Sequence, residues 1–301
     1  MKIFGVDFSS SPSRCKPIVI AQAKLFPDTE TGHDWRLSVE GFETLDSLDG
    51  FAEWLKRPGP WVGGFDFPFA LPRELLMSLA WPPFAQGPIA GANAWSEHIE
   101  HLGHLSRADM VVAFKRFCAA RPVGGKFAHR ACDIPAGASP SMKWVNPPVA
   151  YMLHAGATRL HHAGVMIPGL KLGDPRRVAL EAYPGYLARL VLGRESYKSD
   201  DPRKQNQARR LARGRLLETL CEAPLSEIGM VRATGLNLSL EVNAVLKQRC
   251  VDDASGDHLD AWLCAIQASV GHLWELREPG SHYGMGEIDP LEGWIVGVVR
   301  D

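Results

Sequence analysis

The sequence of 301 residues has little that points to a membrane, a secretory route or a disulfide scaffold. Its six cysteines are scattered and form no Cys-x-x-Cys pair, which argues against a disulfide framework. No run of 18 apolar residues occurs, and Asp7 interrupts the stretch where a signal peptide would need its apolar region. We therefore expect a soluble protein of the reducing cytoplasm, with no membrane partner.

An excess of charge of one sign is also missing. Lys and Arg total 33 against 34 for Asp and Glu, which gives a net charge of −1, so any nucleic acid must be held by a local patch and not by the global field. The sequence lacks GxSxG, Walker A and GxGxxG motifs, which argues against a serine hydrolase, a P-loop NTPase and a dinucleotide enzyme. The 46% of hydrophobic and 22% of charged residues exclude a wholly disordered or fibrous chain.

The hydrophobic pattern predicts an α/β fold. Strands are expected at residues 3–6, 17–23, 35–40, 61–66 and 178–184, with a closing strand at 292–299. Helices are expected at residues 45–55, 205–222 and 256–275. Residues 69–175 are rich in Pro, Gly, Ala and His and contain helical patches near 96–120 and 147–164. We therefore expect one domain over residues 1–301, with 69–175 as an inserted, largely helical cap.

Five carboxylates fall where predicted strands end or where the last predicted helix begins. They are Asp7, Asp66, Glu181, Asp257 and Asp260. In an α/β sheet such strand ends converge on one crevice, and a spacing of three residues places the last two on one helix face. The five side chains are therefore expected in one crevice, although each taken alone also fits a turn, a helix N-terminus or an ion pair.

Small residues follow the two helix carboxylates. A stripe of Ala261, Ala265 and Ala268 lets the predicted helix lie close to the sheet. Clustered carboxylates repel one another unless cations or protons compensate them, and hard oxygen ligands favour Mg²⁺ or Mn²⁺. Two such ions about 3.5 to 4 Å apart can activate water and stabilise the leaving oxygen of a phosphodiester. The pattern therefore predicts a metal-dependent phosphodiester hydrolase.

Four segments together resemble a known superfamily. They are GVDFSSS around Asp7, FDFPFALP around Asp66, LEAYPGYL around Glu181 and GDHLDAWLCA around Asp260. With HRACD, YKSDDP and the terminal EGWI, they resemble the family called domain of unknown function 429, whose members are predicted nucleases of the ribonuclease H-like superfamily. The resemblance covers nearly the whole chain. It implies a mixed five-stranded sheet with flanking helices and a metal-dependent carboxylate centre.

The resemblance also implies roles for single residues. Asp7 would be the central metal ligand, Asp66 the acid of the fourth strand, and Asp260 the acid of the final helix, with Asp257 as its neighbour. Glu181 belongs to the pattern of the narrower family and matches the shared nuclease centre less directly. The implied metal ligands for Mg²⁺ or Mn²⁺ are thus Asp7, Asp66 and Asp260, with Asp257 and Glu181 assisting catalysis.

A basic segment supplies candidates for substrate contact. It runs over Arg203, Lys204, Arg209, Arg210, Arg213 and Arg215 without an acid between them. This segment predicts either phosphate contacts along a nucleic-acid backbone or the charged outer face of an amphipathic surface helix. Lys198 and Arg130 lie in the family-like motifs and are further candidates. The candidate substrate-binding residues are therefore Lys198, Arg130, Arg209, Arg210 and Arg213.

A histidine-rich segment at residues 97–104 is a weaker metal candidate. Its histidines repeat at spacings of three, and imidazoles with carboxylates suit zinc or another transition metal. However, the segment contains no HExxH motif and no cysteine partner. We therefore expect these histidines to be structural or exposed.

Three function classes remain open at this point. The leading hypothesis is a metal-dependent phosphodiester hydrolase that acts on a nucleic acid or a nucleotide. The second is a nucleotide-binding phosphotransferase of the actin-like superfamily, in which the serines after Asp7 would bind phosphate, although FDFPFALP lacks the glycine pair expected of a second phosphate loop. The third is a non-catalytic protein that binds nucleic acid or protein, because a fold does not guarantee an activity.

Overall fold

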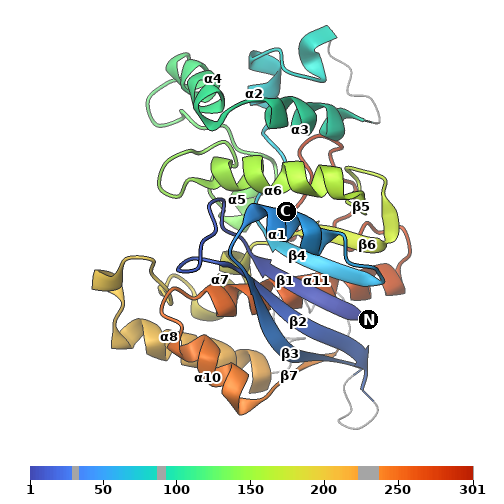
Figure 1. The fold of residues 1–301 in the computed structure, drawn as a ribbon, viewed down its shortest axis with the longest axis vertical. Coiled ribbons are helices and arrows are strands. Elements are labelled where there is room, and N and C mark those ends of the chain that lie inside the picture. The colour runs from blue at the N-terminus through green and yellow to red at the C-terminus, as the bar shows by residue number, and fades with distance from the viewer. Residues whose placement is uncertain (29–33, 87–92, 223–236, 301) are drawn as a thin grey trace.

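A mixed β-sheet with helices on both faces organises the computed structural model, which describes residues 1–28, 34–86, 93–222 and 237–300 (Figure 1). The strands are β1 (Lys2–Asp7), β2 (Ile18–Pro27), β3 (Trp35–Leu45), β4 (Trp61–Asp66), β5 (Val165–Met166), β6 (Asp174–Glu181) and β7 (Leu238–Val242). The longer helices are α1 (Leu48–Leu55), α3 (Ala94–His104), α4 (Arg107–Ala119), α6 (Val149–Ala163), α7 (Pro184–Leu192), α8 (Gln207–Glu222), α10 (Ala244–Asp252) and α11 (Asp257–Arg277). Shorter helical segments are α2 (Arg73–Ser78), η1 (Phe84–Gln86), α5 (Asp133–Ala136) and η2 (Pro202–Lys204). The predicted α/β class is confirmed.

The strand β1 runs through the sheet between β4 and β2. It pairs in parallel with β4, so that Asp7 is the register partner of Asp66, and it pairs antiparallel with β2. Successive side chains point to opposite faces of a strand. Ile3 therefore enters the hydrophobic core on the α11 face, whereas Phe4 and Val6 enter the core that includes α1 and α6.

Glycines allow the helix α11 to lie against the backbone of the central strands. A Cβ atom on Gly5 would lie 1.9 Å from the carbonyl oxygen of Ala261 and 2.3 Å from the amide nitrogen of Ala265. A Cβ atom on Gly64 would lie 2.4 Å from the carbonyl oxygen of Cys264. The predicted alanine stripe thus packs on the sheet as expected, and Gly5 and Gly64 are the matching residues in the strands. This close packing fixes the position of the first turn of α11.

The described residues between 69 and 175, which leave out 87–92, contain α2, η1, α3, α4, α5 and α6, followed by the short edge strand β5 and the start of β6. The helix α6 packs against both α1 and α3, and Figure 1 shows α2, α3 and α4 stacked beyond α6 and away from the sheet. The buried aromatic side chains continue from Phe67 and Phe69 near the sheet to Trp95 and Phe114 in this region. None of the described helices is long and apolar enough to cross a membrane.

The expected number of five strands is wrong, because the described part of the chain forms a sheet of seven strands in the order β5-β6-β4-β1-β2-β3-β7. The two additional strands lie at the edges. The strand β5 has only two residues, and β7 pairs in parallel with the outer side of β3. Such short edge strands carry little periodic signal in a sequence.

The predicted closing strand at residues 292–299 is also wrong. This segment contains Gly293 at a φ of +71° and Gly297 at a φ of +82°, and these left-handed conformations are incompatible with a continuous strand. The segment is held beside β6 instead, where the amide of Val296 donates to the carbonyl oxygen of Glu181 at 2.9 Å.

Candidate metal centre

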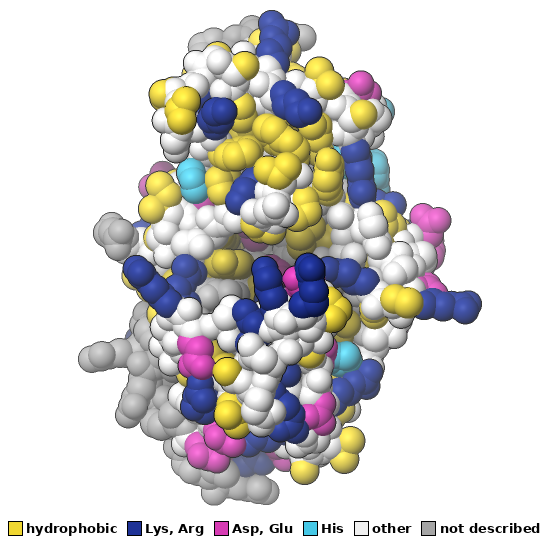
Figure 2. Space-filling model, turned by 90° about the vertical axis from the view of Figure 1, so that its left-hand side faces the viewer, with side chains coloured by type: hydrophobic (Ala, Val, Ile, Leu, Met, Phe, Trp, Pro, Cys, Tyr) yellow, Lys and Arg dark blue, Asp and Glu magenta, His cyan; other side chains and the backbone are white. Residues whose placement is uncertain are grey.

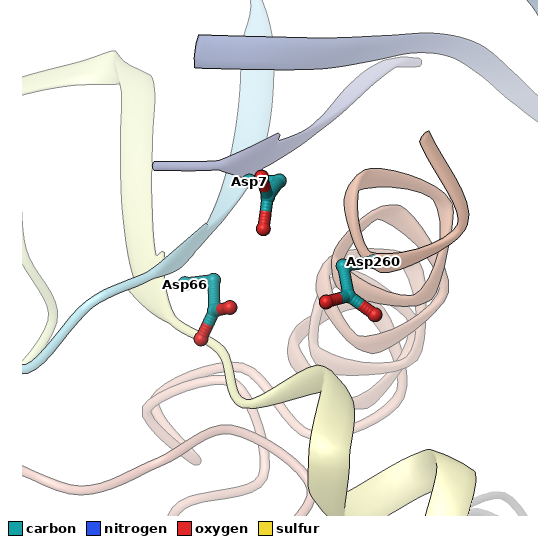
Figure 3. A group of neighbouring side chains, drawn as sticks. All are labelled: Asp7, Asp66 and Asp260. Carbon is teal, nitrogen blue, oxygen red and sulfur yellow. The ribbon is translucent and has the colours of Figure 1, made fainter. Parts of the chain in front are cut away.

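Three carboxylates meet at one end of the sheet. Asp7 ends β1, Asp66 ends β4, and Asp260 lies in the first turn of α11. One possible ligand atom from each of the three lies within 4.8 Å of the other two. Figure 3 shows the three carboxyl groups turned toward the space between the two strand ends and the helix. The structure thus brings together the three residues that the sequence singled out as metal ligands.

The start of α11 is fixed by backbone geometry. Gly256 precedes the helix at a φ of +82°, a conformation that favours glycine, and its carbonyl oxygen accepts from the amide of Asp260 at 2.8 Å. A Cβ atom on Gly256 would lie 2.8 Å from the Cβ of Lys198. The glycine therefore allows the segment that carries Lys198 to pass directly over the helix N-terminus.

Asp260 is fully buried, and its carboxylate accepts hydrogen bonds from two side chains. The hydroxyl of Tyr197 donates to Oδ1 at 2.6 Å, and the ammonium of Lys198 donates to Oδ2. The side chain of Lys198 keeps 40% of its surface exposed. Burial lowers the pKa of Lys198, but the charge of Asp260, with further contributions from Asp7 and Asp66, raises it well above its usual value. Lys198 is therefore charged at neutral pH.

The other two carboxylates lack comparable compensation. Burial, followed by the charges of Asp260 and Asp257, raises the pKa of Asp7 well above its usual value. Burial also raises the pKa of Asp66 to about 7, although Lys198 lowers it. Carboxylates crowded in a low-dielectric space hold protons unless a cation neutralises them. The cluster therefore has a deficit of positive charge.

The donor set suits a hard divalent cation. Carboxylate oxygens bind Mg²⁺, Mn²⁺ or Ca²⁺ at about 2.0 to 2.6 Å, so oxygens that share one ion lie within roughly 5 Å of one another, as the ligand atoms of Asp7, Asp66 and Asp260 do. The cluster offers no sulfur or imidazole ligand, which makes zinc or copper a poorer match. Among the described residues, the histidines of α3 and α6 make no three-ligand group.

Glu181 lies at the end of β6, next to β4, but its carboxylate already accepts hydrogen bonds from other groups of the protein. Its Oε1 accepts from Nη2 of Arg130 at 2.5 Å, and its Oε2 accepts from Nη1 of Arg130 at 2.7 Å and from the amide of Phe69 at 2.9 Å. The same guanidinium donates to Asp133 at 2.9 Å. All three charged side chains are buried. The structure thus places Glu181 and Arg130, predicted to assist catalysis and bind substrate, in a closed ion-pair network that shapes the turn after Asp66.

The basic residues of α8 are also largely engaged within the protein. Arg213 is buried and donates to the carbonyl oxygens of Tyr197 at 2.7 Å and Val251 at 2.8 Å. Arg210 pairs with Asp252 at 2.7 Å, and Arg209 donates to a backbone carbonyl of the preceding loop. Arg203, Lys204 and Arg215 of the basic run are exposed, but Arg213 is not available to a phosphate. The buried Arg213 instead supports the backbone beside Lys198.

The carboxylate cluster opens into a cleft of about 730 Å³, with Asp7, Asp66 and Asp257 among its lining. The basic residues of the cleft are Lys16, Arg189, Arg194 and Lys198. Its apolar residues include Pro147, Pro148, Val149 and Met152. Figure 2 shows Lys and Arg side chains gathered across the middle of the molecule, below a broad hydrophobic area. Except for Lys198, none of these wall residues was predicted, because no spacing in the sequence links them to the acids.

Comparisons with family models, with curated proteins and with solved structures found no match. The function therefore has to be argued from the chemistry of the site, since a fold alone does not define an activity.

Proposed function

We propose that this protein is a Mg²⁺- or Mn²⁺-dependent phosphodiester hydrolase of the ribonuclease H-like type, with a nucleic acid or a nucleotide as its substrate. The observation that carries the proposal is the convergence of Asp7, Asp66 and Asp260, whose ligand atoms lie within 4.8 Å of one another at the base of a cleft. The strands β3, β2, β1, β4 and β6 form a mixed five-stranded portion of the sheet, which supports the resemblance in fold.

The residues of the candidate centre would have different roles. Asp7, Asp66 and Asp260 hold the divalent cation, which when bound activates water and stabilises the leaving oxygen. Lys198 is partly exposed in the cleft and presents its ammonium to a phosphate oxygen. Asp257 lines the cleft, and burial together with the charge of Asp253 raises its pKa. A raised pKa brings a carboxylate closer to the range useful for taking a proton from water at neutral pH.

The walls of the cleft suit a nucleotide chain. Arg189 and Arg194 place positive charge on the wall that carries α7 and the segment after it, and Lys16 adds a charge from the segment between β1 and β2, where phosphates can be bound. Pro147 and Met152 place apolar surface on the wall formed by the start of α6. Proteins that bind single strands combine a basic groove with surfaces on which bases pack. The cleft therefore favours a single-stranded segment over a closed duplex.

The test is cleavage of labelled single-stranded and double-stranded DNA and RNA oligonucleotides with Mg²⁺, with Mn²⁺ or with EDTA. We expect cleavage only with a divalent ion, and a loss of at least about 1,000-fold in Asp7→Asn, because one of the cation's ligands loses its charge. Asp252→Asn removes an acid that pairs with Arg210 outside the cleft and is the matched control. Equal rates for Asp7→Asn and the wild type, or no cleavage of any substrate, would contradict the proposal.

A further inference from the structure

A second groove of about 580 Å³ lies between α1, α3, the first residue of α4 and α6. Its floor is the part of α6 from His154 to Ala163. The beginning of the same helix, at Val149 and Met152, lines the candidate catalytic cleft. The helix α6 therefore runs from the candidate catalytic cleft into this second groove.

The groove carries basic or imidazole side chains on each of its walls. They are Lys56, His104, Arg107, His154, Arg159 and His162. Two acids, Asp49 and Glu100, also line it, and both are exposed. The lysine and the two arginines come from the residue after α1, from α4 and from α6, which are far apart in the sequence and are brought together only by the fold.

The two arginines of the groove are half-buried and bind no carboxylate within the described ranges. Arg159 donates from Nε to the carbonyl oxygen of Leu48 at 3.1 Å and from Nη1 to that of Ala155 at 2.9 Å. Arg107 donates from Nη1 to the hydroxyl of Ser11 at 3.1 Å and from Nη2 to the carbonyl oxygen of Ser10. Some other half-buried arginines have acidic partners, as in the pair of Arg177 with Asp174 at 2.8 Å, whereas Arg189 and Arg209 also donate to backbone carbonyl oxygens.

This arrangement leaves positive charge without a full counterion. Burial lowers the pKa of Arg159, Asp49 raises it, and the charge of Arg107 lowers it again. A partly desolvated cation that has only neutral partners carries an uncompensated electrostatic cost. A bound anion offsets this unfavourable electrostatic energy. A guanidinium matches the geometry of a phosphate, to which it can donate two parallel hydrogen bonds.

We propose that this groove is a phosphate-binding site, in which Arg159 and Arg107 bind the phosphate group of a phosphate ester. Lys56, which directly follows α1, is exposed at the edge of the groove. Arg107 also holds the backbone of Ser10, a residue that lines the catalytic cleft. The phosphate can belong to a polynucleotide that extends from the cleft along α6, a source that rests on the proposed function, or to a separate small phosphate ester.

The experiment measures binding in EDTA, where no cleavage can occur. The probes are a fluorescein-labelled 12-nucleotide single-stranded DNA, followed by anisotropy, and sodium pyrophosphate, followed by calorimetry. Arg159→Met keeps the length and apolar packing of the side chain, and Lys56→Met tests the same groove at an exposed position. Arg116→Met removes an exposed charge from α4 outside the groove and is the matched control.

We expect Arg159→Met to weaken the binding of at least one probe about fivefold or more, Lys56→Met to weaken it about twofold, and Arg116→Met to change it by less than twofold. Loss of DNA binding alone identifies a flanking phosphate of a polynucleotide, and loss of pyrophosphate binding identifies a small phosphate ester. The proposal is overturned if the wild type binds neither probe, or if Arg159→Met and Lys56→Met both bind as tightly as Arg116→Met. Because no metal is present, these outcomes are independent of whether Asp7→Asn abolishes cleavage.

Discussion

Two groups of buried or half-buried acids lie near the ends of β1, β4 and β6, and they differ in how their charge is compensated. Around Glu181 and Asp133, the guanidinium of Arg130 donates to both carboxylates, and backbone amides occupy further oxygens. Around Asp7 and Asp66, the described contacts supply one ammonium, that of Lys198, and its hydrogen bond goes to Asp260. One guanidinium faces the two carboxylates of the first group and donates to both, whereas the one ammonium in the described contacts of the second group donates to neither Asp7 nor Asp66.

The difference separates a structural network from a candidate site. A compensated set of buried charges holds its elements in place and has no oxygen left for a ligand. An uncompensated set has perturbed proton affinities, as the raised pKa values of Asp7 and Asp66 show, and such perturbation concentrates at functional sites. The two groups therefore predict opposite responses to mutation.

The largest expected effect follows from removing the compensation of the Glu181 group. Arg130→Met leaves two buried carboxylates without their cation, which typically costs about 3 to 5 kcal/mol of unfolding free energy. Urea denaturation followed by circular dichroism measures the loss. Arg116→Met, an exposed arginine on α4, provides the control and should change the stability by less than about 0.5 kcal/mol. A loss below about 1 kcal/mol in Arg130→Met would show that the stability of the protein does not depend on the ion pairs of Arg130 with Glu181 and Asp133.

An intermediate effect is expected from removing the ammonium of Lys198, which lies beside the candidate metal ligands. Lys198→Met frees Oδ2 of Asp260 and removes a positive charge beside the carboxylates, so we expect Mn²⁺ to bind about tenfold more tightly, or by about 1.4 kcal/mol. Calorimetric titration with MnCl₂ measures the affinity. Lys16→Met is the matched control, because Lys16 lines the same cleft but pairs with Asp200 at 2.8 Å. Unchanged or weaker binding in Lys198→Met would mean that the ammonium does not compete with the ion.

The smallest effect concerns stability in the absence of metal. Folding raises the pKa of Asp66 from 3.8 to about 7, so the folded protein binds this proton more tightly than the unfolded chain. The resulting destabilisation is absent below about pH 3.8, grows as the pH rises to about 7 and is complete above it. Asp66→Asn in EDTA at pH 8 should therefore raise the melting temperature by about 1 to 2 °C, the shift that roughly 1 kcal/mol produces in a protein of 301 residues.

The Glu181 group provides a control in which the opposite change in melting temperature is expected. Glu181→Gln removes a charge that Arg130 needs, so its melting temperature should fall at pH 8. Thermal unfolding of both variants at pH 4 and pH 8 compares them directly. If Asp66→Asn also lowers the melting temperature at pH 8, the charge of Asp66 is compensated within the protein and the contrast between the two groups disappears.

The sequence was informative where local pattern and chemistry coincide. Buried strands that end in Asp7 and Asp66, and two acids spaced by three at the start of a helix, were enough to predict which carboxylates converge. The same reasoning could not separate Glu181 from them, because it also ends a buried strand. Its partner Arg130 lies 51 residues away in the sequence, and no periodicity connects the two.

The missing parts of the fold have comparable physical reasons. The glycines that admit α11, Gly5 and Gly64, act through contacts with a helix at least 200 residues later in the sequence, so their role becomes visible only in three dimensions. The segment 292–299 has the apolar residues of a strand, but its glycines adopt left-handed conformations that end any ladder. Arg213 belongs to a basic run, yet the fold turns it inward against backbone carbonyls.

The most direct test of the central claim is calorimetric titration of the metal-free protein with MnCl₂, carried out on the wild type, Asp7→Asn, Asp66→Asn and the control Asp252→Asn. Binding does not require a known substrate, so this measurement addresses the carboxylate cluster alone. The account predicts saturable Mn²⁺ binding by the wild type and by Asp252→Asn, and binding at least tenfold weaker in Asp7→Asn and Asp66→Asn. No binding by the wild type, or equal binding by all four proteins, would contradict it.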